Sequence, residues 1–505
     1  MKTTPYWMED TGEPRFGPLQ QHLEVDVVVV GGGVTGVTAA YLAKEAGFTV
    51  ALLERGRWGA AETGHTTAHL TYVTDGRLHE MVGRLGRDHA QAVWDAGLAA
   101  MSEIQRIVEA GKIDCEFQSI PAYLHLPAGL KAASDGAEVN GLREDARLAS
   151  EFGFDAEFLD DVPLVGGPGV RFANQAKFHP RKYLAELIGR ISGDGSQVCE
   201  LTEVTQIEEK EVKAGGYTIR CRHVFIATHV PLQGAAGTVS AALFQTKLAP
   251  YSTYAIGAKM PAGAAPDASF WDTGDPYFYL RVDRHEGHDY AILGGADHKT
   301  GQGGPTEERY AALEKRLHAL VPKAVVKHRW SGQVVETSDG LPFIGATAPQ
   351  QFVATGFSGN GMTFGTLGAM MACDAFRGRK NPWSALFNPE RKVGWGGLWD
   401  YLKENADYPY YLAKQLLSGP EEGALGKIRR GEGKVVVLHG RKVAAYRDGK
   451  GRLTKRSAIC PHLGCVVRWN KAEKTWDCPC HGSRFEARGA VMAGPAETEL
   501  GEADV

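Results

Sequence analysis

The chain of 505 residues lacks long apolar segments and an excess of positive charge. It has no run of about 18 apolar residues, which excludes an evident membrane-spanning helix. The formal net charge of −4 argues against a nucleic-acid partner. Residues Met1 to Leu23 are polar and contain proline, so they do not form a secretory signal. We therefore expect a soluble, cytoplasmic protein of two or three domains.

Cysteine is also scarce, with eight residues in the whole chain. Cys115, Cys199, Cys221 and Cys373 are scattered, as is typical of reduced intracellular thiols. The other four lie in two short boxes, CPHLGC at 460–465 and CPCHGS at 478–483. Thiolates and imidazoles together can hold an iron–sulfur cluster or a structural zinc ion. Proline and glycine favour tight, cluster-binding loops here, whereas zinc fingers place their histidine pair on a helix.

The two boxes resemble those of the Rieske [2Fe–2S] family. In that family the cysteines of the ligand set hold one iron and the histidines hold the other. The resemblance implies four ligands: Cys460, His462, Cys478 and His481. It also implies a disulfide bond between Cys465 and Cys480, which would tie the two loops together.

Two nearby features bear on the reduction potential of such a cluster. Residues 494–496 (GPA) are similar to the proline loop that covers the cluster in the family, and Ser483 can bond a bridging sulfide. Phe485 stands where higher-potential members usually carry a tyrosine. Because hydrogen bonds to sulfur stabilise the reduced cluster, we expect a potential below the top of the roughly −150 to +300 mV Rieske range.

A dinucleotide fingerprint lies near the N-terminus. The apolar run 25–30 predicts a buried parallel strand, the glycine-rich turn 31–36 follows, and a helix then runs to Gly47. A second strand over 49–53 ends at Glu54. In this pattern the glycines permit a tight turn, close approach to pyrophosphate and close helix packing. Glu54 is placed for ribose hydroxyls and excludes a 2′-phosphate, which leaves FAD or NAD.

The next segment, 55–70, resembles the FAD-wrapping loop of the D-amino-acid oxidase-like flavoproteins, the glycine and sarcosine oxidase superfamily. Segments 330–332 and 339–345 and the strand-like run 351–355 are similar to the closing FAD box of that family, and a helix follows from about 361 to 375. A helix N-terminus aimed at the flavin would stabilise its reduced anion. The implied FAD-contacting residues are Gly31, Gly33, Val34, Thr35, Gly36, Glu54, Arg55, Thr66, Thr67, Val204, Gly359, Gly361, Met362 and Thr363.

These patterns predict an α/β FAD-binding Rossmann-like domain, an α+β substrate domain and a C-terminal all-β Rieske domain. After an N-terminal extension over 1–24, the FAD-binding domain is expected to be discontinuous, over 25–80, 175–244 and 330–380. The substrate domain takes 81–174 and 245–329. An aromatic-rich linker over 381–423 precedes the Rieske domain at 424–505.

No general base can be named from the sequence, and the catalytic candidates are few. The resemblance places His69 near the flavin ring. The strands expected over 277–281 and 290–295 put Tyr279 and Arg281 on one face. Arg281 could hold a substrate carboxylate, or it could be an ordinary arginine on a sheet surface. Asp297 and His298 are similar candidates, whereas His229 is interpreted as structural.

His65 is a different kind of candidate. It lies roughly where some relatives that oxidise methylated glycines join a histidine covalently to FAD. The preceding tryptophan is missing here.

A basic segment precedes the first box. Between Lys427 and Arg456 there are eleven Lys or Arg residues and two acidic residues. This segment could dock an acidic redox partner protein, or it could be a solvated face or a face that packs on the chain's own flavin domain.

Together these features predict an amine or amino-acid dehydrogenase that passes electrons between FAD, a Rieske cluster and an external acceptor. Two alternatives remain open. One is a reductase or oxygenase that receives electrons through the cluster. The other is a redox sensor or electron-transfer module without its own substrate. The substrate, the direction of electron flow and the acceptor are not specified by the sequence.

Overall fold

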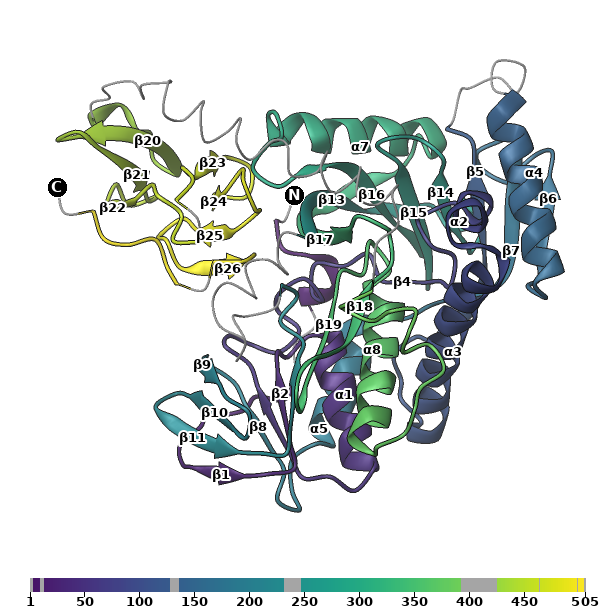
Figure 1. Ribbon diagram of the computed structural model, residues 1–505. Coiled ribbons are helices and arrows are strands. Elements are labelled where there is room, and N and C mark those ends of the chain that lie inside the picture. The colour runs from purple at the N-terminus through teal and green to yellow at the C-terminus, as the bar shows by residue number, and fades with distance from the viewer. Residues whose placement is uncertain are drawn as a thin grey trace.

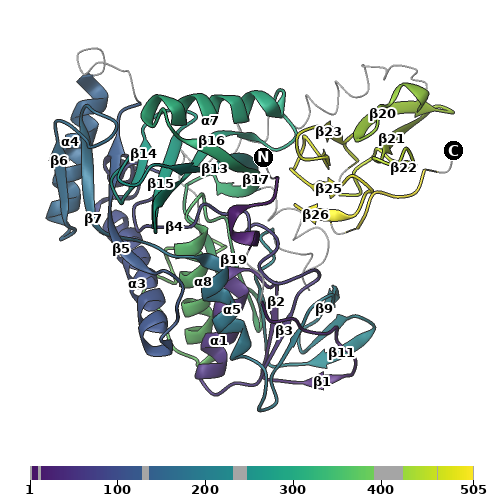
Figure 2. The ribbon, with the colours of Figure 1, turned by 180° about the vertical axis from the view of Figure 1, so that it is seen from behind.

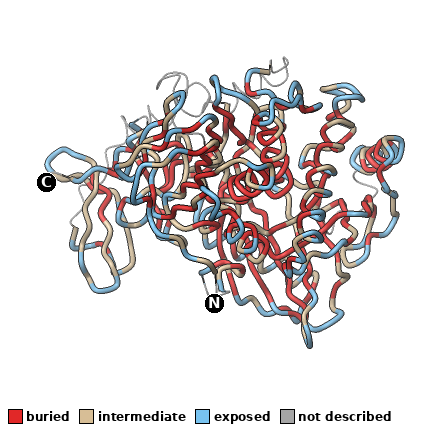
Figure 3. The backbone as a smooth tube through the Cα atoms, turned by 90° about the horizontal axis from the view of Figure 1, so that it is seen from below, coloured by how far each residue is buried: buried red, intermediate tan, exposed pale blue. Residues whose placement is uncertain are grey.

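The computed structural model describes residues 3–9, 13–127, 136–230, 247–391, 425–462, 464–496 and 498–503. Figures 1 and 2 show a large part built of helices and sheets, and a smaller part of short strands at the C-terminal end. Residues 231–244 of the predicted FAD-binding domain and 392–423 of the predicted linker lie outside the described residues. Figure 3 shows that buried residues fill the interior of the large part, while exposed residues mark peripheral loops.

A six-stranded sheet holds the dinucleotide fingerprint. Its strands are parallel except for the edge strand β18, which runs antiparallel to β19. In spatial order they are β18 (Phe343–Ala348), β19 (Gln351–Thr355), β12 (His223–Ile226), β2 (Val27–Val30), β3 (Val50–Leu53) and β8 (Gln197–Cys199). The carboxyl ends of β2, β3 and β12 therefore meet at one edge, where an open α/β sheet binds ligands.

Both faces of this sheet are covered, which explains why β2 and β3 are continuous apolar runs. Val27 and Val29 pack in the core shared with the helices, and Val28 and Val30 pack against a small second sheet. The covering helices are α1 (Val34–Glu45), α5 (Pro180–Gly189) and α8 (Gly361–Phe376), with α3 (Arg87–Gly111) against α8. The second sheet has the order β1 (Leu23–Glu24), β11 (Tyr217–Arg220), β10 (Glu211–Ala214) and β9 (Val204–Ile207).

A nine-stranded sheet forms the other half of the large part. Its main path is β17 (Val325–Thr337), β13 (Leu248–Met260), β16 (His288–Lys299), β15 (Phe278–His285), β14 (Ser269–Asp272), β5 (Gln118–His125), β7 (Gly169–Lys177) and β4 (His69–Leu70), and β6 (Ala156–Leu159) pairs with β7. Helix α7 (Thr306–Leu320) packs on β13 and β16, and α4 (Gly136–Glu151) packs on β6 and β7. Helix α2 (Leu78–Leu85) contacts α3 and α4, and the short 3-10 helix η1 (Tyr6–Glu9) contacts α5.

Two strands of the large sheet cross the predicted domain boundaries. β7 continues past the boundary at 174/175, and β17 begins before the boundary at 329/330 and pairs with β13 to residue 337. Both strands start in one predicted domain and end in the next, because a long strand is held by its ladder of partners and not by local composition. The two predicted domains are therefore joined by the continuous strands β7 and β17.

The C-terminal part contains two antiparallel sheets. After the 3-10 turn η2 (Leu425–Lys427) they comprise β20 (Glu432–Leu438), β21 (Arg441–Arg447) and β22 (Leu453–Ser457), then β23 (Arg468–Asn470), β24 (Thr475–Asp477), β25 (Arg484–Glu486) and β26 (Val491–Ala493). Trp476, Phe485 and the cysteines of both boxes share its buried core. Figure 1 places β23–β26 next to the large part and β20–β22 on the side turned away from it.

Candidate functional site

A cavity of about 550 Å³ opens at the carboxyl ends of β2 and β3. The turn after β2, the segment after β3 and the loop before α8 form one side of its wall, and β13 and β15 contribute to the other. Twelve of the fourteen predicted FAD-contacting residues line it: Gly31, Gly33, Val34, Thr35, Glu54, Arg55, Thr66, Thr67, Val204, Gly359, Gly361 and Met362. Gly36 and Thr363 are not among the lining residues, but each contacts one that is: Gly36 packs on Gly31, and Thr363 bonds to Thr71.

The glycines of the fingerprint are required by close contacts. Gly31 has φ +110°, and a Cβ there would lie 2.4 Å from the Ala227 carbonyl oxygen. A Cβ on Gly36 would lie 1.9 Å from the Gly31 carbonyl oxygen. The first turn of α1 therefore sits directly on the strand end, as a dinucleotide site needs.

Glu54 is fixed at the end of β3 by two backbone donors. Its Oε2 accepts a hydrogen bond from the Gly32 N–H at 2.7 Å, and its Oε1 accepts one from the Gly56 N–H at 2.6 Å. Thr63 Oγ1 accepts from the Val34 N–H at 3.0 Å, at the N-terminus of α1. Thr63 was not predicted, because its role depends on the fold of the 55–70 loop and not on a motif.

The loop before α8 brings a second helix N-terminus to the cavity. Gly359, Gly361 and Met362 line the wall, and Thr363 Oγ1 donates a hydrogen bond to the Thr71 carbonyl oxygen at 2.8 Å. Asn360 Nδ2 donates to the Val73 carbonyl oxygen at 3.3 Å. These bonds aim the partly positive end of α8 into the cavity, where it favours an anionic group.

Polar and aromatic side chains from the nine-stranded sheet line the same cavity. Tyr277, just before β15, donates a hydrogen bond to Asp75 Oδ2 at 3.0 Å. The Tyr279 hydroxyl bonds Thr253 Oγ1 at 2.7 Å, and the His69 ring meets the Tyr279 ring edge-on at 5.7 Å between centroids. Asp75 was missed in the sequence because it follows no motif.

Enclosure shifts the pKa values of two of these groups. The Asp75 side chain is exposed on the cavity wall, and desolvation by the protein around the cavity raises its pKa to about 7. Burial, with a smaller contribution from the Arg281 guanidinium, lowers the pKa of His69 to about 4. His69 is therefore neutral near pH 7.

Arg281 lies behind the cavity wall. Its side chain is 1% exposed, its Nη1 donates to the Ala68 carbonyl oxygen at 2.7 Å, and its Nε donates to Asp283 at 2.9 Å. Of the three catalytic candidates, His69 and Tyr279 line the cavity and Arg281 does not. Asp297, on β16, also lies outside the lining, and burial raises its pKa to about 6.

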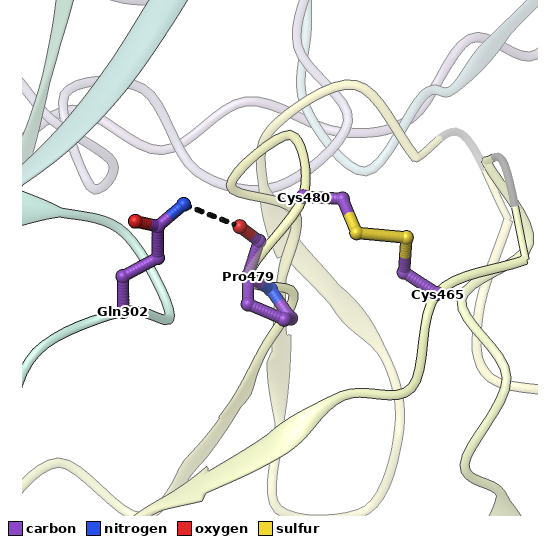
Figure 4. Close-up of a disulfide and its surroundings, with 4 residues drawn as sticks. All are labelled: Gln302, Cys465, Pro479 and Cys480. Atoms are coloured by element: carbon purple, nitrogen blue, oxygen red, sulfur yellow. Dashed lines mark hydrogen bonds between the residues drawn. A yellow bond between two sulfur atoms is a disulfide. The ribbon is translucent and has the colours of Figure 1, made fainter. Parts of the chain in front are cut away.

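The two cysteine–histidine boxes face each other in the C-terminal part. The structure has a disulfide bond between Cys465 and Cys480 (Figure 4), as the resemblance implied. The Cys478 thiol interacts with that of Cys460, and this contact followed by burial raises its pKa. The rings of His462 and His481 lie 4.9 Å apart between centroids and nearly perpendicular. Two thiols and two imidazoles on paired loops are the donor set that a Rieske cluster takes.

The Sγ atoms of Cys465, Cys478 and Cys480 also lie within 4.8 Å of one another. This trio is not a ligand set, because two of its sulfurs are joined to each other. The disulfide holds the loops together and leaves Cys460 and Cys478 as the thiols of the boxes.

The proline loop packs on the second box. A Cβ on Gly494 would lie 2.5 Å from Ser483 Cα, and the Ala496 N–H donates to Ser483 Oγ at 3.1 Å. Ser483 and Phe485 are fully buried.

The second box also packs against the large part. Gln302 Nε2 donates to the Pro479 carbonyl oxygen at 2.9 Å (Figure 4), and Gln333 Nε2 donates to the Gly482 carbonyl oxygen at 2.8 Å. A Cβ on Gly301 would lie 2.7 Å from Pro479. The proline-loop side contributes Met492, Ala493, Gly494, Ala496 and Thr498 to the cavity lining itself.

Two protein-family models match this chain, one over the large part and one over the C-terminal part. The model described as FAD dependent oxidoreductase matches residues 26–375, and the Rieske [2Fe-2S] domain model matches residues 422–503. The chain belongs to the FAD dependent oxidoreductase family. It carries a Rieske [2Fe-2S] domain as its C-terminal part. The fold class and the two cofactors predicted from the sequence, FAD and a [2Fe–2S] cluster, are confirmed.

Individual relatives agree with this assignment. A putative Rieske 2Fe-2S iron-sulfur protein, YhfW of Bacillus subtilis, is 32% identical over 509 residues, covering 99% of this chain and 97% of the relative. Glycine oxidase from Geobacillus kaustophilus has a similar fold, with a TM-score of 0.60 and 17% identity over 74% of this chain and 100% of that one. L-proline dehydrogenase from P. horikoshii also has a similar fold, with a TM-score of 0.59 and 18% identity. The match covers 74% of this chain and 98% of that one. Among the described residues, no helix has the length and apolar character to cross a membrane.

Proposed function

We propose that this oxidoreductase is an amine or amino-acid dehydrogenase in which electrons taken from the substrate at FAD leave through the Rieske cluster to an external acceptor. The observation that carries the proposal is that residues of both parts line one cavity. Gly31 and Glu54 of the fingerprint share it with Met492 and Gly494, which flank the Rieske loops. A chain that used its two cofactors separately would not need this arrangement.

Polar contacts keep the second cluster loop against the wall of the FAD site. Gln333 is buried on β17, and its side chain donates to both Gly482 and Thr300. Its backbone N–H donates to Glu62, a residue of the 55–70 segment. One residue thus touches the FAD-binding loop and the loop that carries His481.

When bound, FAD takes two electrons as hydride from a C–H bond beside nitrogen, and the cluster carries one electron at a time. The chain's own contribution is to place and desolvate the amine. His69 is neutral and Tyr279 is hydrogen-bonded to Thr253, so both can orient a neutral amine without protonating it. The solved relatives named glycine oxidase and L-proline dehydrogenase support chemistry of this type by analogy of fold.

The acceptor is proposed to be an acidic redox protein that docks on the basic segment Lys427–Arg456. This segment forms β20–β22, and Figure 1 shows these strands on the side of the Rieske domain away from the FAD-binding part. The interdomain contacts described above come instead from the second box, and the cavity lining comes from Met492, Ala493, Gly494, Ala496 and Thr498. A basic face turned outward supports a partner of opposite charge.

The direct test is anaerobic reduction of the purified protein with a panel of amines and amino acids. Flavin absorbance and the EPR signal of the reduced Rieske cluster are followed together. We expect both to change with a true substrate. A cluster that stays oxidised while the flavin is bleached would disprove the relay, and metal analysis that found zinc in place of iron and sulfide would disprove the cluster.

His65 remains a candidate for covalent attachment of FAD, and the sequence does not decide between covalent and non-covalent binding. His65 lines the cavity, and its Nδ1 lies 2.9 Å from the Ala61 carbonyl oxygen. Acid precipitation tests it, because flavin that is released into the supernatant is not covalently bound.

A further inference from the structure

The end of the cavity under the nine-stranded sheet contains a carboxylate and, among the described lining residues, no Lys or Arg side chain. Asp75 lines this end. Among the described lining residues, the only Lys or Arg side chains are Arg55 and Arg57, which follow Glu54 at the end of β3. Arg57 is paired with Glu200 at 2.8 Å. Arg281, the residue that could have held a substrate carboxylate, is turned into the protein behind Ala68.

The Asp75 carboxylate has one polar partner in the described part of the chain. The Tyr277 hydroxyl donates to its Oδ2 at 3.0 Å, and no ion pair is made. Its oxygens lie close to the loop before α8, where a Cβ on Gly359 would lie 2.5 Å from Oδ2. The carboxylate faces the cavity with no positively charged side chain paired to it among the described residues, so a cationic group in the cavity can pair with it.

Aromatic rings surround the same space. Trp271, Tyr277, Tyr279 and Phe357 line the cavity, and the rings of the two tyrosines lie 5.4 Å apart between centroids. The negative faces of such rings attract cations, and the attraction grows when water is excluded. The neighbouring His69 is neutral and adds no repulsion.

We propose that this compartment binds an ammonium group of the substrate between Asp75 and the aromatic rings, separate from the neutral amine that is oxidised, so that the substrate is a cationic amine without a carboxylate at this end. The inference rests on the proposed function and narrows it from amines or amino acids to cationic amines. An amino acid would bring its carboxylate to a site that offers a carboxylate and no guanidinium. Asp75 is then a specificity-determining residue.

Non-reacting ligands test the charge preference on the oxidised holoenzyme. Benzyltrimethylammonium, phenylacetate and the neutral tertiary-alcohol analogue of the cation are titrated while the visible flavin band is followed. We expect the cation to perturb the band and to bind at least about tenfold more tightly than the alcohol. Stronger binding of phenylacetate, equal binding of cation and alcohol, or no response to the cation would overturn the proposal.

The Asp75→Asn variant assigns the preference to one residue. It keeps the size of the side chain and removes the charge, so we expect cation affinity to fall about tenfold and alcohol affinity to stay the same. Asp114→Asn, an exposed acid-to-amide change away from the cavity, is the matched control. Unchanged cation affinity in Asp75→Asn with normal flavin content would refute the assignment, and the wild-type titrations stand even if the variant loses FAD.

These titrations do not depend on electron transfer. If the cation binds as expected but the cluster is never reduced by any amine, the relay fails and the charge preference stands. If amines reduce both cofactors but phenylacetate binds better than the cation, the relay stands and the charge preference fails.

Discussion

Asp75 makes ligand binding depend on pH at the scale of a single residue. Its pKa is raised to about 7 by burial, and the ionisable groups that face it are Tyr277, before β15, and Asp297, on β16. Gly359 and its neighbours in the loop before α8 have no ionisable side chain, and the partly positive N-terminus of α8 follows directly after this loop. Only the ionised form of Asp75 attracts a cation, so protonation removes the attraction.

This predicts how affinity for benzyltrimethylammonium, which has no proton to lose, varies with pH. The dissociation constant should rise as the pH falls through the Asp75 pKa of about 7, by about tenfold in total, the same loss that is expected in Asp75→Asn, and it should be level well above and well below this pH. Flavin absorbance titrations across this range measure it. In Asp75→Asn the dependence should vanish, and a wild-type affinity that does not vary with pH would contradict the role of Asp75.

Gly36 allows a second prediction at the residue scale. In Gly36→Ala the new Cβ would meet the Gly31 carbonyl oxygen at 1.9 Å, so α1 must move away from the strand end. We expect the free energy of unfolding to fall by about 1–3 kcal/mol and the bound flavin per chain to fall with it. Denaturant unfolding and the ratio of visible to ultraviolet absorbance measure the two effects.

Gly189→Ala is the matched control for this change. Gly189 ends α5, and a Cβ there would have no atom within 4 Å. Alanine should be neutral or stabilise by roughly 0.5–1 kcal/mol. Equal flavin content in Gly36→Ala and in the control would contradict the packing role of Gly36.

At the scale of elements, β17 joins the FAD cavity to the Rieske domain. Gly332 and Gln333 on this strand line the cavity, and the Gln333 side chain reaches the Gly482 carbonyl oxygen of the second box. The strand therefore fixes the distance between the two cofactor sites.

Gln333→Leu tests this function of β17. The change keeps the volume and removes the donor, leaving the Gly482 carbonyl oxygen without this partner, so the cluster loop is expected to loosen. Stopped-flow reduction with a substrate should show flavin bleaching at the wild-type rate and cluster reduction slowed by about tenfold or more. Gln105→Leu, on the exposed face of α3, is the control. Equal slowing of both phases would mean a general loss of structure.

The sequence predicts those elements whose function depends on local chemistry. The fingerprint strands β2 and β3, helices α1 and α8 and strand β19 were all expected within a few residues, because apolar periodicity and glycine punctuation specify them. Helix α5 begins at Pro180, as the first-turn preference of proline indicates.

Features that depend on distant partners were not predicted. Asp75 acquires its role from Tyr277, 202 residues away, and Gln333 from Gly482, 149 residues away. The small β1–β11–β10–β9 sheet and the length of β13 and β17 were also missed, since their residues pair across long separations and carry no motif. The sequence around one residue of such a pair does not identify its distant partner.

At the scale of the whole molecule, positive charge is concentrated in the segment Lys427–Arg456 of the Rieske domain, although the chain as a whole has a net charge of −4. The basic strands β20–β22 face away from the FAD-binding part; Lys434 and Arg441 are exposed on β20 and β21, and Lys450 is exposed in the turn between β21 and β22. A surface of this kind speeds the encounter with an oppositely charged protein, and the gain is lost as salt rises.

A charge-reversed variant tests the surface. In Lys434→Glu/Lys450→Glu, we expect oxidation of the reduced enzyme by an acidic electron-carrier protein to slow by about tenfold at low salt, with a smaller difference at high salt. Oxidation by a small neutral quinone should be unaffected and serves as the control reaction. A rate that does not depend on salt or on the charge reversal would show that the acceptor docks elsewhere.

The cavity wall that the Rieske domain supplies also has a consequence for biogenesis. Met492, Gly494 and Thr498 close one side of the flavin site only once their domain has folded against it. We therefore expect maturation to have an order, in which FAD enters an open precursor before iron–sulfur insertion and docking of the Rieske domain close this side of the site. Cells starved of iron should accumulate chains that release their flavin readily, so that a deficit in one nutrient disables both redox centres.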